Sequence, residues 1–297
     1  MMDWYTADIR TAVHSFSSWT NLRLLPQWYP MVLASFATYK LLYNVIGPSL
    51  TRWLLPDFYS NLSSRKRLDW DIHIVSFTNA VVITILSGRV VLYDKDWRQM
   101  NWEQRAWDHT QPSALALSVG NGYFYWHLLQ MIQHREVYGM AMVVHAFAVA
   151  FVMTLGFRPA FVAYAPATYL YETSTIFLNI NRALAMFKME GTTAQKVNGL
   201  FLVISFFLSR IVWGICVTLQ FYHDVYTIFT MQQKDGYTLP ARAETLPTWL
   251  LVSEVLSCTA LQFLNFMWFW KIVQALRRKF VESSSRTKQG KVTTKQE

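Results

Sequence analysis

The chain has 297 residues, of which 53% are hydrophobic and 16% aromatic, and its formal net charge is +9. The apolar residues form long blocks, which indicates one membrane domain instead of two soluble domains. Eight of the 27 Lys and Arg residues lie at or after Lys271, so we expect the charge to face a membrane surface and predict no nucleic-acid partner. The two cysteines, Cys216 and Cys258, lie in apolar blocks and are too few for a zinc site.

Seven stretches are, or nearly are, long and apolar enough to cross a bilayer, which takes about 20 residues per helix. In chain order these predicted spans are 28–47, 70–92, 113–133, 138–157, 160–180, 199–222 and 247–270. Strands have no obvious place in such a chain. The sequence therefore predicts an all-α fold, a polytopic membrane helical bundle of about seven transmembrane helices.

Basic residues favour the cytoplasmic side of a membrane. The flanks 48–69, 134–137 and 181–198, together with the tail from residue 271, hold 16 Lys and Arg residues, whereas the opposite flanks hold eight. We therefore predict a lumenal amino terminus and a cytoplasmic carboxy terminus.

This topology divides the chain into four parts. Residues 1–27 form a lumenal segment, and residues 28–64 form the first transmembrane helix with its cytoplasmic loop. The main membrane domain covers residues 65–275. The final segment SSSRTKQGKVTTKQE is polar, lysine-rich and free of aromatic residues, so we expect residues 276–297 to be a disordered basic cytoplasmic tail.

Five ionisable residues fall well inside the predicted spans: Arg210, Glu172, His127, His145 and Glu254. A charge in hydrocarbon costs roughly 2.5–3.5 kcal/mol, so each of them requires a partner or water. At a rise of 1.5 Å per residue, Glu172 lies roughly 12 Å and Arg210 roughly 16 Å from the predicted cytoplasmic boundary, on consecutive antiparallel helices. They could form an ion pair that only fixes helix packing, or one residue could engage a lipid headgroup or acyl carbonyl.

The two histidines lie at matching depths, roughly 9 Å for His127 and roughly 11 Å for His145. Histidine exchanges a proton near neutral pH, so a facing pair could supply a base and a donor for acyl transfer. Each could equally be a hydrogen-bonded packing residue. Two histidines fall short of a metal site, and we predict no metal. Glu254 lies nearer the lumen and is expected outside this group.

Polar side chains follow two of the predicted spans. On the second span, His73, Ser76 and Asn79 recur every three residues and lie on overlapping parts of one side. On the fifth span, Glu172, Thr175 and Asn179 share a face, whereas Ser174 is expected to point elsewhere. The two faces could line a polar cavity that opens to the cytoplasmic leaflet, or they could hold ordinary interhelical hydrogen bonds.

Three segments carry a family resemblance: GYFYWHLLQMIQHREVYGMAMVVHA at 122–146, FRPAFVAYAPATYLYETSTIFLNINRAL at 157–184 and NGLFLVISFFLSRIVWG at 198–214. Together they resemble the TLC-domain family, which includes ceramide synthases and lipid-homeostasis proteins of the endoplasmic reticulum. The resemblance covers residues 65–275 and is nearest to an uncharacterised fungal branch. It implies a TLC-type bundle in the endoplasmic reticulum. The residues that look similar to the family pattern are His145, Glu172, Ser174, Thr175, Asn179 and Arg210.

The sequence also departs from the ceramide synthases. Of the family pattern Trp-x-x-Arg-x-x-Ser-x-x-His it keeps Trp70 and Ser76 but has His73 and Asn79 at the other two positions, and Ala146 follows His145 where synthases have paired histidines. We therefore predict a role in lipid homeostasis, through binding or sensing a sphingolipid or phospholipid in an intramembrane polar cavity, with no cofactor. The alternative is an acyltransferase that uses acyl-CoA, with His145 as base.

Overall fold

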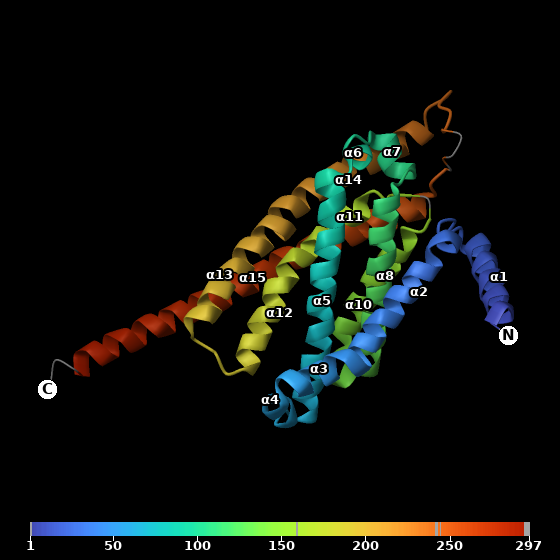
Figure 1. Ribbon diagram of the computed structural model, residues 1–297. Helices are drawn as coiled ribbons and strands as arrows, with labels where there is room; N and C mark the ends of the chain where they lie inside the picture. The colour runs from blue at the N-terminus through green and yellow to red at the C-terminus, as the bar shows by residue number, and fades with distance from the viewer. Residues whose placement is uncertain (1, 159, 241–242, 244, 294–297) are drawn as a thin grey trace.

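The computed structural model describes residues 2–158, 160–240, 243 and 245–293, and no strand occurs among them. The all-α prediction is therefore confirmed for the described chain. A helix at the amino terminus, α1 (Met2–Thr20), precedes a bundle of long helical rods (Figure 1).

Seven rods make up the bundle within the described residues. In chain order they are α2 (Leu25–Leu41) with η1 (Leu42–Ile46) and α3 (Gly47–Leu54); α5 (Ser64–Tyr93); α8 (Gln111–Gln133); α10 (Met140–Leu155); α11 (Tyr164–Tyr169) with η2 (Leu170–Glu172) and α12 (Thr173–Met186); α13 (Thr193–Phe206) with η3 (Phe207–Val212) and α14 (Trp213–Gln232); and α15 (Thr248–Thr293). Each predicted span overlaps one rod. Short helices join the rods, namely α4 (Pro56–Ser60), α6 (Lys95–Arg98), α7 (Trp102–Trp107) and α9 (Arg135–Tyr138).

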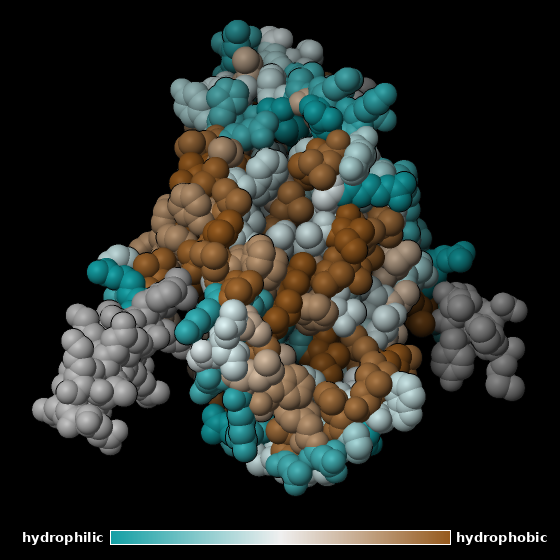
Figure 2. All heavy atoms as spheres, turned by 60° about the vertical axis from the view of Figure 1, so that its left-hand side comes forward, coloured by the Kyte–Doolittle hydropathy of each residue, from teal (hydrophilic) through white to brown (hydrophobic). Residues whose placement is uncertain are grey.

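The surface of the bundle is that of a membrane protein. Three of its segments, Ser64–Tyr93, Thr193–Gln232 and Thr248–Ala275, are individually long and apolar enough to cross a bilayer. Figure 2 shows apolar side chains forming a belt between two polar ends. The belt includes strongly exposed apolar residues such as Ile85, Leu208 and Leu256, which would be costly to leave in water. The protein is therefore integral to the membrane.

The fifth rod begins later than the predicted span 160–180. Residues 160–163 form turns, and Phe161 has a positive φ of 61°. Its N–H donates to the carbonyl of Ala106, which ties this turn to α7. Irregular backbone is tolerated at such a place because Ala160, Phe161 and Val162 are buried in protein, away from lipid.

Helices in contact close a ring in the order α5, α8, α10, α15, α14 with α13, and α12 with α11, which returns to α5. The first rod stays outside this ring, where α2 packs along α8 (Figure 1). Gly122 permits this close approach, because a Cβ atom there would lie 2.5 Å from the Cβ of Ser35. The ring brings Glu172, Ser174 and Thr175 together with Arg210.

A buried ion pair fastens the upper end of the ring in Figure 1, where α6 and α7 lie. Asp224 of α14 is fully buried, and Arg105 of α7 donates to its two oxygens from Nε at 2.6 Å and Nη2 at 2.8 Å. The Tyr164 hydroxyl donates to the same carboxylate at 2.6 Å. These bonds to Asp224 raise the pKa of Arg105, so the guanidinium stays charged.

The last helix extends into the carboxy-terminal segment. The structure continues α15 as a helix to Thr293, and residues 294–297 lie outside the described residues. No proline occurs between Thr248 and Thr293, and lengthening an existing helix needs no new nucleus. The backbone of this extension runs away from the ring at the lower left of Figure 1.

Candidate functional site

Arg210 lies on an irregular turn in the middle of the sixth rod. The turn, η3, is π-helical, a geometry frequent at functional sites. Its neighbours Phe207 and Leu208 are exposed on the apolar belt, whereas only 13% of the Arg210 side chain is exposed. The extra residue in the turn thus lets apolar side chains face lipid while the guanidinium points into the ring.

The guanidinium of Arg210 is held by side chains from two other rods. Its Nη2 donates to Glu172 Oε1 at 3.3 Å and to Thr175 Oγ1 at 3.1 Å, and its Nε donates to Ser174 Oγ at 2.9 Å. On the other side, Nη1 donates to Asn265 Oδ1 at 3.4 Å. The ion pair between Glu172 and Arg210 that their depths allowed is therefore present.

Ser174 differs from its predicted orientation, because it joins this cluster instead of pointing elsewhere. Ser174 and Thr175 are adjacent at the start of α12, and the elongated guanidinium group bonds both of them, Ser174 through Nε and Thr175 through Nη2. We call Glu172, Ser174, Thr175, Arg210 and Asn265 the Arg210 cluster.

The two histidines lie beside the Arg210 cluster without bonding to it. His145 lies within electrostatic range of Arg210 and Glu172, and His127 within range of His145. The ring of His145 meets the edge of Trp268 at 5.5 Å between centroids, and His127 stacks on Tyr123 at 5.7 Å. The predicted proximity of the histidines is thus present, but among the described residues neither imidazole has a hydrogen-bond partner.

A chain of polar contacts leads from the lower end of the ring towards the Arg210 cluster. At the rim, Arg182 donates to Asp69 at 2.6 Å, and His73 lies 3.5 Å from the same carboxylate. His73 then bonds Asn179 at 2.6 Å, and Asn179 donates to Ser76 Oγ at 3.1 Å. The predicted polar faces of the second and fifth spans therefore meet, bonded directly to each other.

Asn79 is the predicted cavity residue that stands apart. It is 1% exposed, and its Oδ1 accepts a hydrogen bond from the hydroxyl of Tyr39 on α2, outside the ring. Each step of three residues leaves the side chain about 60° short of a full turn, so Asn79 lies about 120° from His73 around the helix and faces α2. Its role in the fold is to join α5 to the first rod.

Two polar residues of α15 were missed by the sequence analysis. Gln262 donates from Nε2 to the backbone carbonyl of Arg210 at 3.2 Å, and Asn265 accepts from its guanidinium. The Gln262 Oε1 and Asn265 Nδ2 atoms are buried and have no partner among the described residues. The signal was present in the spacing, because Glu254, Cys258, Gln262 and Asn265 follow at intervals of four, four and three along one helical face.

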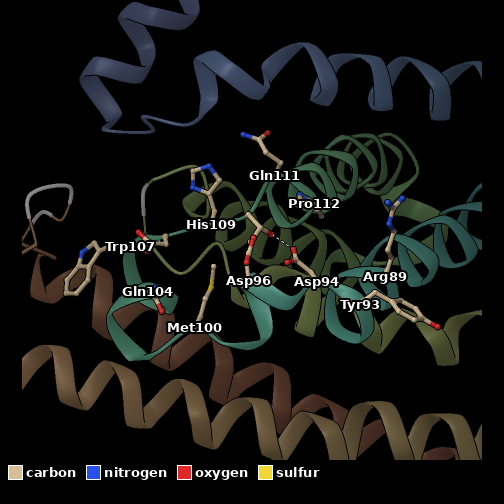
Figure 3. A pocket seen from close by; sticks show the side chains of 12 residues that line it. Arg89, Tyr93, Asp94, Asp96, Met100, Gln104, Trp107, His109, Gln111 and Pro112 are labelled. Carbon is tan, nitrogen blue, oxygen red and sulfur yellow. Dashed lines mark hydrogen bonds between the residues drawn. The ribbon is translucent and has the colours of Figure 1, made fainter.

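Two pockets flank the ring interior, and neither is lined by Arg210 or by His127 and His145. The larger, of about 870 Å³, opens at the upper end (Figure 3). Asp94 and Asp96 lie side by side there, between His109 and Arg89. The carboxylate of Asp94 already accepts two hydrogen bonds of the fold, because it caps α6 and accepts from the hydroxyl of Thr110. Burial lowers the pKa of His109.

The smaller pocket has a volume of about 80 Å³ and lies inside the bundle, between α10, α11, α14 and α15. Gln262 lines it and also contacts Arg210, so this pocket adjoins the Arg210 cluster. Among the described residues, no group of three or more His, Cys, Asp or Glu side chains is placed to hold a metal ion.

Comparison with known proteins assigns the fold. The family model of the TLC domain matches residues 69–274, which is most of the chain and includes the whole Arg210 cluster. The chain belongs to the TLC domain family. The matched region covers nearly all of the ring from α5 to α15, and the first rod lies before it.

Several curated proteins resemble this chain over most of its length. An uncharacterized TLC domain-containing protein of Schizosaccharomyces pombe is 28% identical over 268 residues, covering 90% of this chain and 85% of that protein. The topoisomerase I damage affected protein 4 of Saccharomyces cerevisiae is 24% identical, and the match covers 90% of this chain and 94% of that protein. The human TLC domain-containing protein 4 is 24% identical, and the match covers 80% of this chain and 85% of that protein. The TLC family is implicated in lipid homeostasis.

Proposed function

We propose that this protein acts in lipid homeostasis by binding the polar part of a membrane phospholipid or sphingolipid at the Arg210 cluster. The observation that carries the proposal is the unpartnered amide Nδ2 of Asn265, which is buried beside the Nη1 atom of Arg210. Both groups donate hydrogen bonds, so they suit an oxygen atom of a phosphate or an acyl carbonyl.

The electrostatics of the cluster support the same ligand. Glu172 balances the charge of Arg210, so the pair can remain in the membrane without a ligand. The cluster uses four of the five N–H groups of Arg210, which leaves one N–H of Nη1 for recognition. The polar contacts from Asp69 and Asn179 extend this environment towards the rim, where a lipid headgroup would enter.

Removing the unpartnered donor tests this proposal while sparing the ion pair. Asn265→Leu should lower the fraction of protein that retains a lipid in native mass spectrometry by about tenfold, because one hydrogen bond to a charged group contributes about 1.5–3 kcal/mol. The matched control is Asn198→Leu, since Asn198 is also buried but bonds the backbone of Phe177. Equal retention by both variants, or no bound lipid on the wild type in several detergents, would argue against the site.

A second candidate function is acyl transfer from acyl-CoA to a lipid amine or alcohol. The electrostatic proximity of His145 to Arg210 and Glu172, and of His127 to His145, favours it, with His145 as base and Arg210 or Thr175 stabilising the developing oxyanion. It ranks second because no hydrogen bond among the described residues fixes the tautomer of His145, whose ring makes a T-shaped contact with Trp268.

The two candidates differ in what His145→Ala does. For a lipid-binding protein we expect wild type and His145→Ala to transfer no more acyl groups from acyl-CoA than a protein-free control. Loss of a general base typically slows an enzyme about 10²–10⁴-fold, so an activity that falls by this amount would establish the acyltransferase instead. His223→Ala serves as the control, because that side chain is 71% exposed and lies on α14, beyond the π-helical turn that carries Arg210.

We further propose an endoplasmic-reticulum location with the amino terminus in the lumen. The supporting observation is the basic group Arg52, Arg65, Lys66 and Arg67, which lies with α3, α4 and the start of α5 at the lower end in Figure 1. Asn61 of this end carries the sequon Asn-Leu-Ser and is exposed. We expect it to remain unmodified, and a gel shift abolished by both glycosidase and Asn61→Gln would reverse the orientation.

A further inference from the structure

Glu254 is the intramembrane ionisable residue that the proposed function does not use. It lies on α15, and its carboxyl group has no hydrogen-bond or ion-pair partner among the described residues. On the adjoining face of the same helix, Val252 is 49% and Leu256 63% exposed, which places this stretch of α15 against lipid. An isolated carboxylate in such surroundings is costly, so the group takes up a proton instead of remaining charged.

Glu254 lines the pocket of about 80 Å³ between α10, α11, α14 and α15. The remaining walls are mainly apolar, with Val152, Phe161 and Val217 among them. A single buried water needs about 15 Å³ and two to four polar partners, so this space exceeds one water and offers few sites to hold several. The size and lining of the pocket suit a short apolar segment of a ligand that carries one small polar group.

Gln262 is another polar residue that lines the same pocket. Gln262 is 9% exposed, and its Nε2 is fixed on the carbonyl of Arg210, which leaves its buried Oε1 without a partner. The backbone at Gly214 comes close to this oxygen, since a Cβ atom there would lie 2.8 Å away, so the amide has little freedom to turn. The pocket therefore combines an acceptor at Gln262 with a carboxyl group that can both donate and accept.

We propose that this pocket binds the hydroxyl group of a neutral lipid alcohol, with Glu254 as its partner. A hydroxyl both donates and accepts one hydrogen bond, which matches a protonated carboxyl group, and it brings no charge into an apolar site. An amine would require both groups to be charged and would lose more hydration on entering. The site is separate from the Arg210 cluster, which offers hydrogen-bond donors to a phosphate or carbonyl oxygen.

Photoreactive probes distinguish this site from general lipid contact. The wild-type protein in detergent is labelled with a diazirine-bearing long-chain alcohol, with the methyl ether of the same chain, and with the corresponding amine. We expect the alcohol to label peptides from α10 and α15 that contain Val152 and Leu261, about tenfold more than the ether does. Label that maps elsewhere, or equal labelling by alcohol and ether, would overturn the proposal.

Two substitutions at the same position sharpen the test. Glu254→Gln keeps a neutral donor and acceptor and should retain labelling by the alcohol, whereas Glu254→Leu should reduce it about tenfold. Glu190→Gln, an exposed glutamate on the loop before α13, is the control for substitution itself. If Glu254→Gln loses the label as fully as Glu254→Leu, or if the amine labels the pocket more strongly than the alcohol, the ligand is not a neutral alcohol.

Discussion

Asp224→Asn is expected to lower the free energy of unfolding by about 3–5 kcal/mol, which is the cost of removing one partner of a buried ion pair. Asp224 is fully buried and accepts two bonds from Arg105 and one from Tyr164. The neutral amide leaves the guanidinium without its counter-charge and turns an NH₂ group towards other donors. Reversible unfolding in mixed micelles, followed by tryptophan fluorescence, measures the change.

The control for this prediction is Asp96→Asn, because Asp96 is exposed at the same end of the bundle. Combining Asp224→Asn with Arg105→Met should recover part of the loss, since the second change removes the uncompensated cation. If Asp224→Asn unfolds like Asp96→Asn, the carboxylate does not fasten α7 to α14.

Glu172→Gln is expected to cost about 3 kcal/mol, the lower end of the range for breaking a buried pair. The value is at the lower end because Glu172 is 20% exposed and because Ser174 and Thr175 still accept from the guanidinium. Nevertheless, Arg210 would keep its charge in the membrane without an anion beside it. The same unfolding assay reports the loss.

A double-mutant cycle tests whether Arg210 is the partner of Glu172. Glu172→Gln with Arg210→Met should be more stable than Glu172→Gln alone, because no charge is then left in the ring. Glu190→Gln provides the exposed control. An unfolding midpoint for Glu172→Gln that equals that of the wild type would mean that Glu172 does not compensate Arg210.

Hydropathy predicted the membrane bundle because each span must satisfy its own backbone hydrogen bonds in lipid. The ion pair of Glu172 and Arg210 was also accessible, since consecutive antiparallel helices bring similar depths together. The bond between Arg210 and Ser174 was not, because the π-helical turn at Arg210 changes the angular spacing that an ideal α-helix assumes. Such irregular turns have no strong signature in one sequence.

The residues missed by sequence analysis are joined to their partners across long distances in the chain. Asp224 lies just beyond the predicted sixth span and 119 residues from Arg105, so neither appeared as an intramembrane charge. Asn265 is 55 residues from Arg210, and nothing in its own segment indicates that contact. The polar spacing along α15 identifies a face but not the helix that it meets.

Cryo-electron microscopy of the protein in nanodiscs made from native lipids tests most directly whether the Arg210 cluster holds the polar part of a membrane lipid. We expect lipid density in the ring with an oxygen atom about 3 Å from Asn265 Nδ2 and within reach of Arg210 Nη1. Density that shows Asn265 Nδ2 bonded to a protein group, with lipid only on the outer belt, would contradict it.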